Sequence, residues 1–372
     1  MSTSSRYFFY GIVFILVFAA SSIYFGGLLG PKDLVITPHI DPVAQTSPQL
    51  VANHSFPFEG ATLVVTVPIN NSVYEGARQA DQKITVYGNV SENTWLADSY
   101  RAMITDPAQD DFYRDLTGEL NKIRVSNGLS DDEYLELMAV YVQSLQYEVN
   151  TDTPARYPIE TVMDGAGDCE DKSLLLAGLL SHEGYRVALF SFGPEDHMAV
   201  GVGSDSSLYK NTGYAFVETT VYSYIGVPTT TLAGGVVLRS DPLVIPISDG
   251  TKEYTSGNET SFLEDSVTLT EKRIEELEPQ LNASAQDLNA KQARISSLEA
   301  QMTSMRSRGD LRGYNSQVSA HNALVTAYNT ELAGYRQTLA LYQNYVQIHN
   351  YIVLNAFDRK GVYQYAKQNL VT

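Results

Sequence analysis

Near its beginning the chain has a largely apolar run, residues 7–30, that contains no charged side chain. A helix rises about 1.5 Å per residue, so this run can cross a hydrocarbon core of roughly 30 Å. Arg6 adds a positive charge before the run, whereas the charges of Lys32 and Asp33 after it cancel. This difference favours a cytoplasmic location for the short N-terminal tail. We therefore predict a tail and transmembrane anchor over 1–30, single-pass in the cell membrane and in contact with the lipid bilayer, with an extracytoplasmic main domain. A cleaved signal peptide is the alternative, although its apolar core is usually shorter.

Residues 31–60 lose this apolar pattern and contain several prolines. Such a segment predicts a stalk between the anchor and a folded domain. Residues 61–69 and 83–87 are short runs rich in β-branched side chains, which predicts strands. We expect them to form a small β preface to a domain over 61–257.

Apolar residues at helical spacing follow, and they predict three helices, over residues 95–104, 110–125 and 131–147. Residues 156–167 contain a proline and glycines and are predicted as a loop, and the apolar block 173–180 as a buried helix. Three strand-like runs follow after Gly184, and they predict strands over residues 186–192, 197–203 and 214–220. This order predicts an α+β fold with helices on one face of an antiparallel sheet.

The last part of the chain, residues 258–372, shows apolar residues at every seventh position. One series is Ile274, Leu281, Leu288, Ile295 and Met302, and a second is Leu311, Val318, Val325, Leu332, Leu339, Val346 and Val353. Two such arms predict an antiparallel coiled-coil helical hairpin, followed by a C-terminal helix. Pro279 is expected to kink the first arm or to mark its start. A stripe of tyrosine and histidine, offset by three from the second series, is interpreted as packing between the arms.

The amino-acid composition excludes several kinds of binding partner and site. The chain has 43 acidic and 25 basic residues and a formal net charge of −18, so binding to nucleic acid is excluded on electrostatic grounds. It contains one cysteine, which excludes an intramolecular disulfide and a zinc site made of several cysteines.

That cysteine, Cys169, lies at the predicted start of a helix. The helix dipole and the free backbone N–H groups there favour a thiolate, whereas the neighbouring carboxylates oppose it, so the thiol needs a partner base. His197 opens a predicted strand and can act as general base and then acid. Glu218, at the end of the next strand, can orient its imidazole. Cys169, His197 and Glu218 are thus the predicted catalytic residues.

The carboxylates beside the thiol are Asp168, Glu170 and Asp171. They complement the helix dipole, repel acidic substrates, or bind Ca²⁺ through their oxygens with help from loop carbonyls. These three interpretations stay open, and Ca²⁺ is the one cofactor that the sequence suggests.

Residues 142–220 resemble the transglutaminase-like superfamily, whose papain-like core places a Gly-x-Cys at a helix start, a His on a strand and an Asp at a strand end. Gly167-Asp168-Cys169, His197 and Glu218-Thr219-Thr220 match these stations, with Glu in place of Asp. The stretch GDCED is most similar to bacterial and archaeal transglutaminase-like cysteine peptidases. The resemblance implies a papain-like fold and acyl transfer through a thioester.

We therefore expect a membrane-anchored extracytoplasmic cysteine hydrolase, a peptidase or amidase that acts on a protein or peptide substrate. Transfer to a lysine amine, which would crosslink proteins, is the same chemistry with another acceptor. The alternative is a surface protein without catalysis that binds a partner or tethers through its coiled coil. Self-association through the hairpin is possible in either case.

Overall fold

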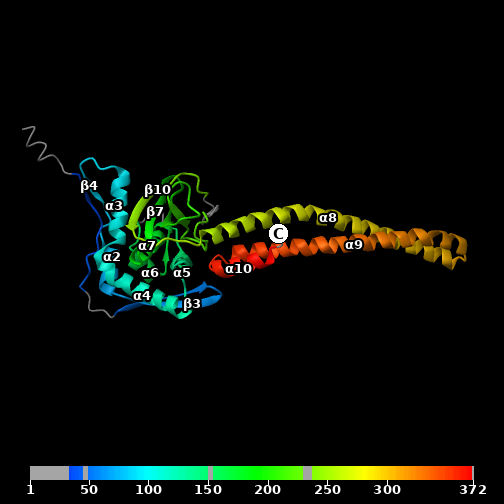
Figure 1. Cartoon of the computed structure of the whole chain (residues 1–372), viewed down its shortest axis with the longest axis horizontal. Helices are drawn as coiled ribbons and strands as arrows, with labels where there is room; N and C mark the ends of the chain where they lie inside the picture. Colours follow the sequence, from blue (N-terminus) through cyan, green and yellow to red (C-terminus); the bar gives the residue numbers. More distant parts are fainter. Residues whose placement is uncertain (1–32, 45–48, 150–153, 229–236, 371–372) are drawn as a thin grey trace, which may run out of the picture.

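The computed structural model describes residues 33–44, 49–149, 154–228 and 237–370. Within them the chain is α+β, as predicted: a mixed domain carries a long arm of two helices (Figure 1). The anchor predicted over residues 7–30 lies outside the described residues. Over the stretches that the structure describes, no helix combines the length and the apolar character needed to cross a bilayer.

The centre of the domain is a four-stranded antiparallel sheet. Its strand order is β10 (Leu243–Asp249), β7 (Arg186–Phe192), β8 (His197–Gly203) and β9 (Tyr214–Val217). The predicted strands over 186–192, 197–203 and 214–220 are thus confirmed, the last one ending at Val217. One face of the sheet is part of the main hydrophobic core, and the other face carries a separate aromatic cluster that includes Phe190, Tyr209 and Phe216.

The helix α7 (Cys169–His182) packs against the sheet, and its residues from Asp171 to Leu180 are all buried. Its side chains from Leu174 to Leu180 are shielded from solvent on all sides, because α5 (Asp131–Ser144) and α4 (Asp110–Asn127) cover its other faces. A helix that is apolar all round has to be enclosed in this way. Cys169 at its first turn is consequently held by a rigid element.

Gly178 lets α4 approach α7 closely, because a Cβ at this position would collide with the hydroxyl of the buried Tyr113. Replacing Gly178 by alanine is expected to lower the free energy of unfolding by about 1–3 kcal/mol through overpacking. Gly118, on the exposed side of α4, has nothing near its missing Cβ. Gly118→Ala should therefore stabilise by about 0.5–1 kcal/mol. Urea unfolding of both variants checks the pair, and equal effects would contradict the close approach.

The N-terminal part differs from the prediction. A strand, β2 (Leu50–Phe58), lies within the region expected to be a stalk and pairs with β3 (Ala61–Ile69) along its whole length. Its Ala52, Phe56 and Phe58 are buried in the main core. Residues 50–58 therefore belong to the folded domain. Prolines at its edges hid an alternation of apolar and polar positions that does predict a strand.

Helices α2 (Asn71–Gln79), α3 (Glu92–Ile104) and α4 and the small sheet of β1 (Leu34–Ile36) with β4 (Thr85–Tyr87) complete this part. The segment predicted as a loop over 156–167 instead forms α6 (Pro158–Asp164) and β6 (Ala166–Gly167). The helix predicted over 131–147 ends at Ser144, because β5 (Gln146–Tyr147) pairs in parallel with β6.

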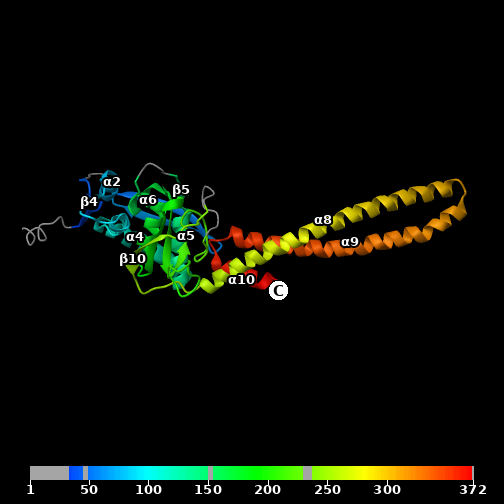
Figure 2. The same ribbon diagram turned by 90° about the horizontal axis from the view of Figure 1, so that it is seen from above.

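The arm consists of α8 (Gly257–Ser307) and α9 (Leu311–Leu354), followed by α10 (Arg359–Asn369), which packs back on both (Figures 1 and 2). Contacts between the two long helices run from Thr270 with His349, through Lys291 with Glu331, to Glu299 with His321. Partner numbers fall as α8 advances, so the hairpin is antiparallel as predicted.

The heptad positions Leu281, Leu288, Ile295 and Met302 of α8 are buried, and the tyrosine and histidine stripe of α9 is half-buried against them. Pro279 lies inside α8, which begins well before it, so the arm does not start at this proline.

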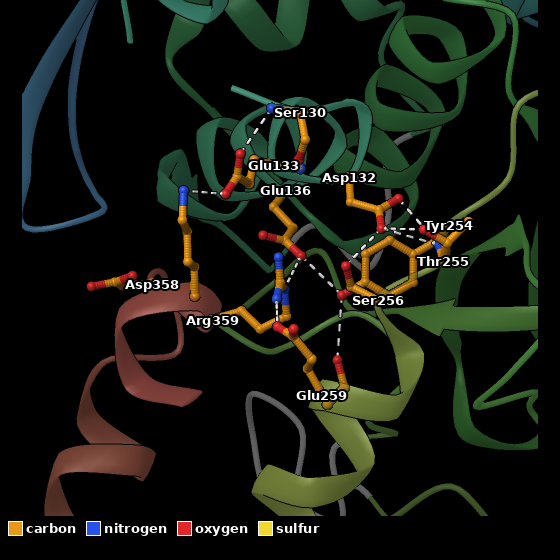
Figure 3. A network of polar contacts seen from close by, with 12 residues as sticks. Ser130, Asp132, Glu133, Glu136, Tyr254, Thr255, Ser256, Glu259, Asp358 and Arg359 are labelled. Carbon is orange, nitrogen blue, oxygen red and sulfur yellow. Dashed lines mark hydrogen bonds and ion pairs between the residues drawn. The ribbon is translucent and has the colours of Figure 1, made fainter. Parts of the chain in front are cut away.

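A buried polar cluster joins the arm to the domain (Figure 3). We call it the root cluster: Glu136 of α5, Tyr254, Glu259 of α8 and Arg359 of α10. The Arg359 guanidinium forms ion pairs with the carboxylates of Glu136, at 2.5 Å from nitrogen to oxygen, and of Glu259. The Tyr254 hydroxyl donates a hydrogen bond to Glu136 at 2.9 Å. Beside it, Asp132 accepts hydrogen bonds from Thr255 and Ser256. Three helices far apart in sequence are thereby fixed at one point.

Candidate active site

A cavity of about 270 Å³ opens at the first turn of α7, and we call it the thiol cavity. Its lining includes Tyr100, Tyr147, Asp168, Cys169, Glu170, Asp196 and His197. Two of the three predicted catalytic residues thus share one cavity. Glu218 lies behind His197, fully buried.

Local geometry explains the position of Cys169. Asp168 is the N-cap of α7 and forms a capping box with Asp171, whose side chain bonds back to the Asp168 backbone N–H. Asp171 comes so near Gly167 that a Cβ there would lie 2.7 Å from it. The glycine before the cap is therefore a packing requirement, and it sets Cys169 as the first residue of the helix.

The thiol contacts the backbone on either side of His197. Its Sγ lies 3.9 Å from the Asp196 carbonyl oxygen. Burial is the main cause that raises the pKa of the Cys169 thiol to about 12. The negative charges of Asp168, Glu170 and Glu218 contribute to the rise, whereas a hydrogen bond from the Met198 backbone N–H opposes it. The expectation that the helix dipole depresses this pKa is thus wrong, because desolvation outweighs the dipole. The resting group is a thiol that must give its proton to a base.

His197 and Glu218 form a buried pair, with 3.2 Å between Nε2 and Oε2. The other carboxylate oxygen, Oε1, accepts the backbone N–H groups of Thr219 and Thr220 and the Thr220 hydroxyl, at 3.0, 2.8 and 2.6 Å. Burial raises the pKa of the Glu218 carboxyl, but the hydrogen bonds from His197 and Thr220 outweigh burial and hold it below its usual value. Glu218 is therefore an ionised acceptor.

This arrangement fixes the tautomer of His197. An ionised carboxylate accepts and cannot donate, so the neutral imidazole carries its proton on Nε2, toward Glu218. The second ring nitrogen, Nδ1, then has a free lone pair. A ring in this state can take a proton from a thiol, and the glutamate stabilises the imidazolium that results.

A second layer of buried groups holds these residues. Gln143 of α5 donates to the Glu218 backbone carbonyl at 2.8 Å, and Ser173 of α7 donates to the Met198 carbonyl at 3.1 Å. Lys172 donates to the carbonyl of Gln143 near the end of α5 and to that of Leu145 directly after it, and burial lowers the pKa of Lys172 to about 8. These contacts tie α5, α7 and the strand ends into one frame.

Sequence reasoning missed Tyr147 and Tyr100, which line the cavity. Tyr147 arrives there because β5 pairs with β6, so that Tyr147 lies opposite Gly167, two residues before the thiol. Tyr100 of α3 donates its hydroxyl to Glu170. The strand pair is only two residues long, and no pattern in the sequence announces it.

The three carboxylates predicted as calcium ligands do not converge. Asp168 and Asp171 cap the helix, Asp171 also accepts the Arg156 backbone N–H at 2.6 Å, and Glu170 is bonded to Tyr100. Among the residues with described positions, no group of three histidine, cysteine or acidic side chains is placed to hold a metal ion. The capping interpretation accounts for Asp168 and Asp171.

Comparison with known proteins gives no relative. No family model matches the chain, and no curated protein and no solved structure matches it.

Proposed function

We propose that this protein is a cysteine hydrolase of transglutaminase-like type, a peptidase or amidase that works by acyl transfer through a thioester. The observation that carries the proposal is the buried His197–Glu218 pair beside Cys169, from which we infer the imidazole tautomer that a general base requires. The resemblance of GDCED, His197 and Glu218-Thr219-Thr220 to that superfamily supports it. We also propose that residues 7–30 anchor the protein in the membrane and that the main domain lies outside the cytoplasm.

In the proposed reaction, Sγ of Cys169 attacks the carbonyl carbon of an amide while its proton passes to Nδ1 of His197. The C–N bond then breaks, and the imidazolium returns the proton to the leaving amine. Water attacks the resulting thioester, His197 accepts one proton of the water, and the carboxylic acid leaves as the thiol is restored. The imidazolium exists twice in each cycle, and both times the Glu218 carboxylate stabilises it.

The tetrahedral intermediate carries a negative oxygen that needs donors. The backbone N–H of Cys169, in the first turn of α7, has no partner within the helix and is one donor. Tyr147 is the side-chain candidate for the second. Burial raises the pKa of its hydroxyl, and the neighbouring Cys169 adds to the shift, so this group keeps its proton when charge develops nearby.

The direct test is digestion of a peptide library by the full chain in water enriched in ¹⁸O, with Cys169→Ser as the control. New C-termini that contain ¹⁸O, together with an acyl adduct on the Cys169 peptide after acid quenching, support hydrolysis. Crosslinked lysines without new C-termini would show transfer to amines instead. Identical peptide patterns for both chains would refute catalysis and favour the binding module.

Glu218→Gln should reduce turnover and the alkylation of Cys169 at pH 7 by about 10²–10⁴-fold. The amide oxygen would keep the bonds to Thr219 and Thr220, so its NH₂ group would face His197. This donor selects the tautomer with the proton on Nδ1, which cannot accept one from the thiol. The measurement is the rate of carbamidomethylation, with the urea-unfolded variants as controls that should react alike. A folded variant with the wild-type rate would contradict the role of the glutamate.

A further inference from the structure

The charge of the thiol cavity is one-sided. Among its lining residues three are carboxylates, Asp168, Glu170 and Asp196, and no lysine or arginine is present. Arg156, whose charge acts on Asp168, lies outside the lining and is paired with Glu148 at 3.2 Å, Asp171 at 3.8 Å and Asp164 at 3.9 Å. A ligand that enters the cavity therefore meets a negative field that the described residues do not neutralise there.

Asp196 differs from the other two carboxylates because its side chain is exposed and makes no hydrogen bond or ion pair with any described part of the chain. Its position is built by the fold. The short helix η2 (Gly193–Glu195) ends at Asp196, whose φ of 49° places it in the left-handed region directly before His197. The thiol is only 3.9 Å from its backbone oxygen. The Asp196 carboxylate is consequently a free anion at the mouth of the reacting centre.

We infer that the thiol cavity selects acyl donors that carry a cation, a lysine or arginine side chain next to the bond under attack, and that Asp196 is the specificity-determining residue. This inference rests on the proposed function, since it names the substrate class of the same site. A cation there would pair with Asp196 and reduce the repulsion among the three carboxylates. Burial and that repulsion raise the pKa of Asp168 and of Glu170, which accords with a site that lacks its counterion.

The charge preference can be measured without a known substrate. Because the chain has one cysteine, every thiol reagent reports on Cys169. We would compare two methanethiosulfonates on the full chain, one with a trimethylammonium group and one with a sulfonate, each normalised to its rate with 2-mercaptoethanol. The normalised ratio should favour the cation on the order of tenfold at low salt and shrink as NaCl is added.

Asp196→Asn should reduce this preference severalfold, because asparagine keeps the shape and tolerates the left-handed conformation. The matched control is Asp205→Asn, which removes the same charge at the other end of β8, where Asp205 is exposed. It should leave the ratio unchanged. A ratio near one in the wild type, or equal ratios in both variants, would overturn the inference.

Failure of the inference and failure of the proposed function are distinguishable. If the rates with both reagents fall in His197→Ala while the ratio stays near one, the catalytic pair stands and the charge preference is absent. If the ratio favours the cation but His197→Ala changes neither rate, the cavity attracts cations without a catalytic base. For a catalytic site with the preference, peptides with lysine should be cleaved faster than their norleucine analogues, and Asp196→Asn should narrow that gap.

Discussion

Replacing His197 by alanine is expected to slow the carbamidomethylation of Cys169 at pH 7 by 100-fold or more. With a pKa of about 12, roughly 10⁻⁵ of the thiol is ionised at pH 7, against about 3% for an unperturbed cysteine. In the proposed mechanism the wild-type imidazole accepts the proton, and Glu218, which contacts the ring, stabilises the resulting ion pair. Without the ring, the folded variant should react far more slowly than the same variant unfolded in urea.

The measurement is the rate of iodoacetamide labelling from pH 6 to 10. The rate of His197→Ala should rise tenfold per pH unit across the range, because only the ionised fraction of the thiol reacts. The wild-type rate should be higher and should depend less steeply on pH, because the imidazole accepts the proton in the proposed mechanism. His321→Ala, which removes a histidine of the hairpin that contacts Glu299, should behave as the wild type. Equal profiles for the wild type and His197→Ala would show that the ring does not serve the thiol.

Replacing Arg359 by methionine should lower the free energy of unfolding at pH 8 by about 3–5 kcal/mol. Arg359 is buried between Glu136 and Glu259 in the root cluster, and burial already raises the pKa of Glu136 to about 7 although Arg359 lowers it. Without the guanidinium, Glu136 would be a buried carboxyl with no cation, so its folded pKa would rise further.

The sign of the pH dependence follows from this shift. A carboxyl with a raised folded pKa contributes stability that is present below its unfolded pKa, near 4.3, and is lost as the pH rises through the folded value. The deficit of Arg359→Met should therefore be smallest near pH 4 and grow above pH 7. Urea unfolding across this range measures it.

Two controls separate the buried charge from a general loss of packing. Adding Glu136→Gln to Arg359→Met removes the uncompensated charge and should restore part of the stability at pH 8. Arg273→Met breaks an exposed ion pair with Glu276 on α8 and should cost less than about 1 kcal/mol. A small, pH-independent effect of Arg359→Met would show that Glu136 does not depend on its counterion.

The order of the helices and strands around Cys169 was predictable, because each of them has a recognisable pattern of apolar residues in the sequence. The strands of the sheet are short runs of mostly apolar residues buried on both faces, α7 is apolar, and both arms of the hairpin repeat every seven residues. Once a helix start and two strand ends are assigned, the antiparallel pairing of β8 with β9 brings His197 to Glu218, and the packing of α7 on β8 adds Cys169. The residues named for the site thus followed from local signals.

Other elements were missed although the sequence marks them. Pro158 at the first position of α6, Glu160 in its capping box and Gly165 in the left-handed conformation at its end are helix boundary signals, but the proline and glycines were interpreted as a loop. The thiol pKa could not be predicted for another reason. The helix dipole acts locally and is visible in sequence, whereas desolvation depends on Tyr100, Tyr147 and other residues brought from distant segments.

The hairpin leads the chain back to the place where α8 leaves the domain, because α10 joins α8 and α5 in the root cluster. The turn at Arg308 to Asp310 lies at the far end of the arm (Figure 2). The length of α8 and α9 can therefore change without changing the root cluster that attaches the arm to the domain. Adding one heptad to each helix preserves the register of the two arms and moves the tip outward by about 10 Å. The distance from the domain to the tip can thus be lengthened or shortened in discrete steps while the domain over residues 50–257 keeps the same shape.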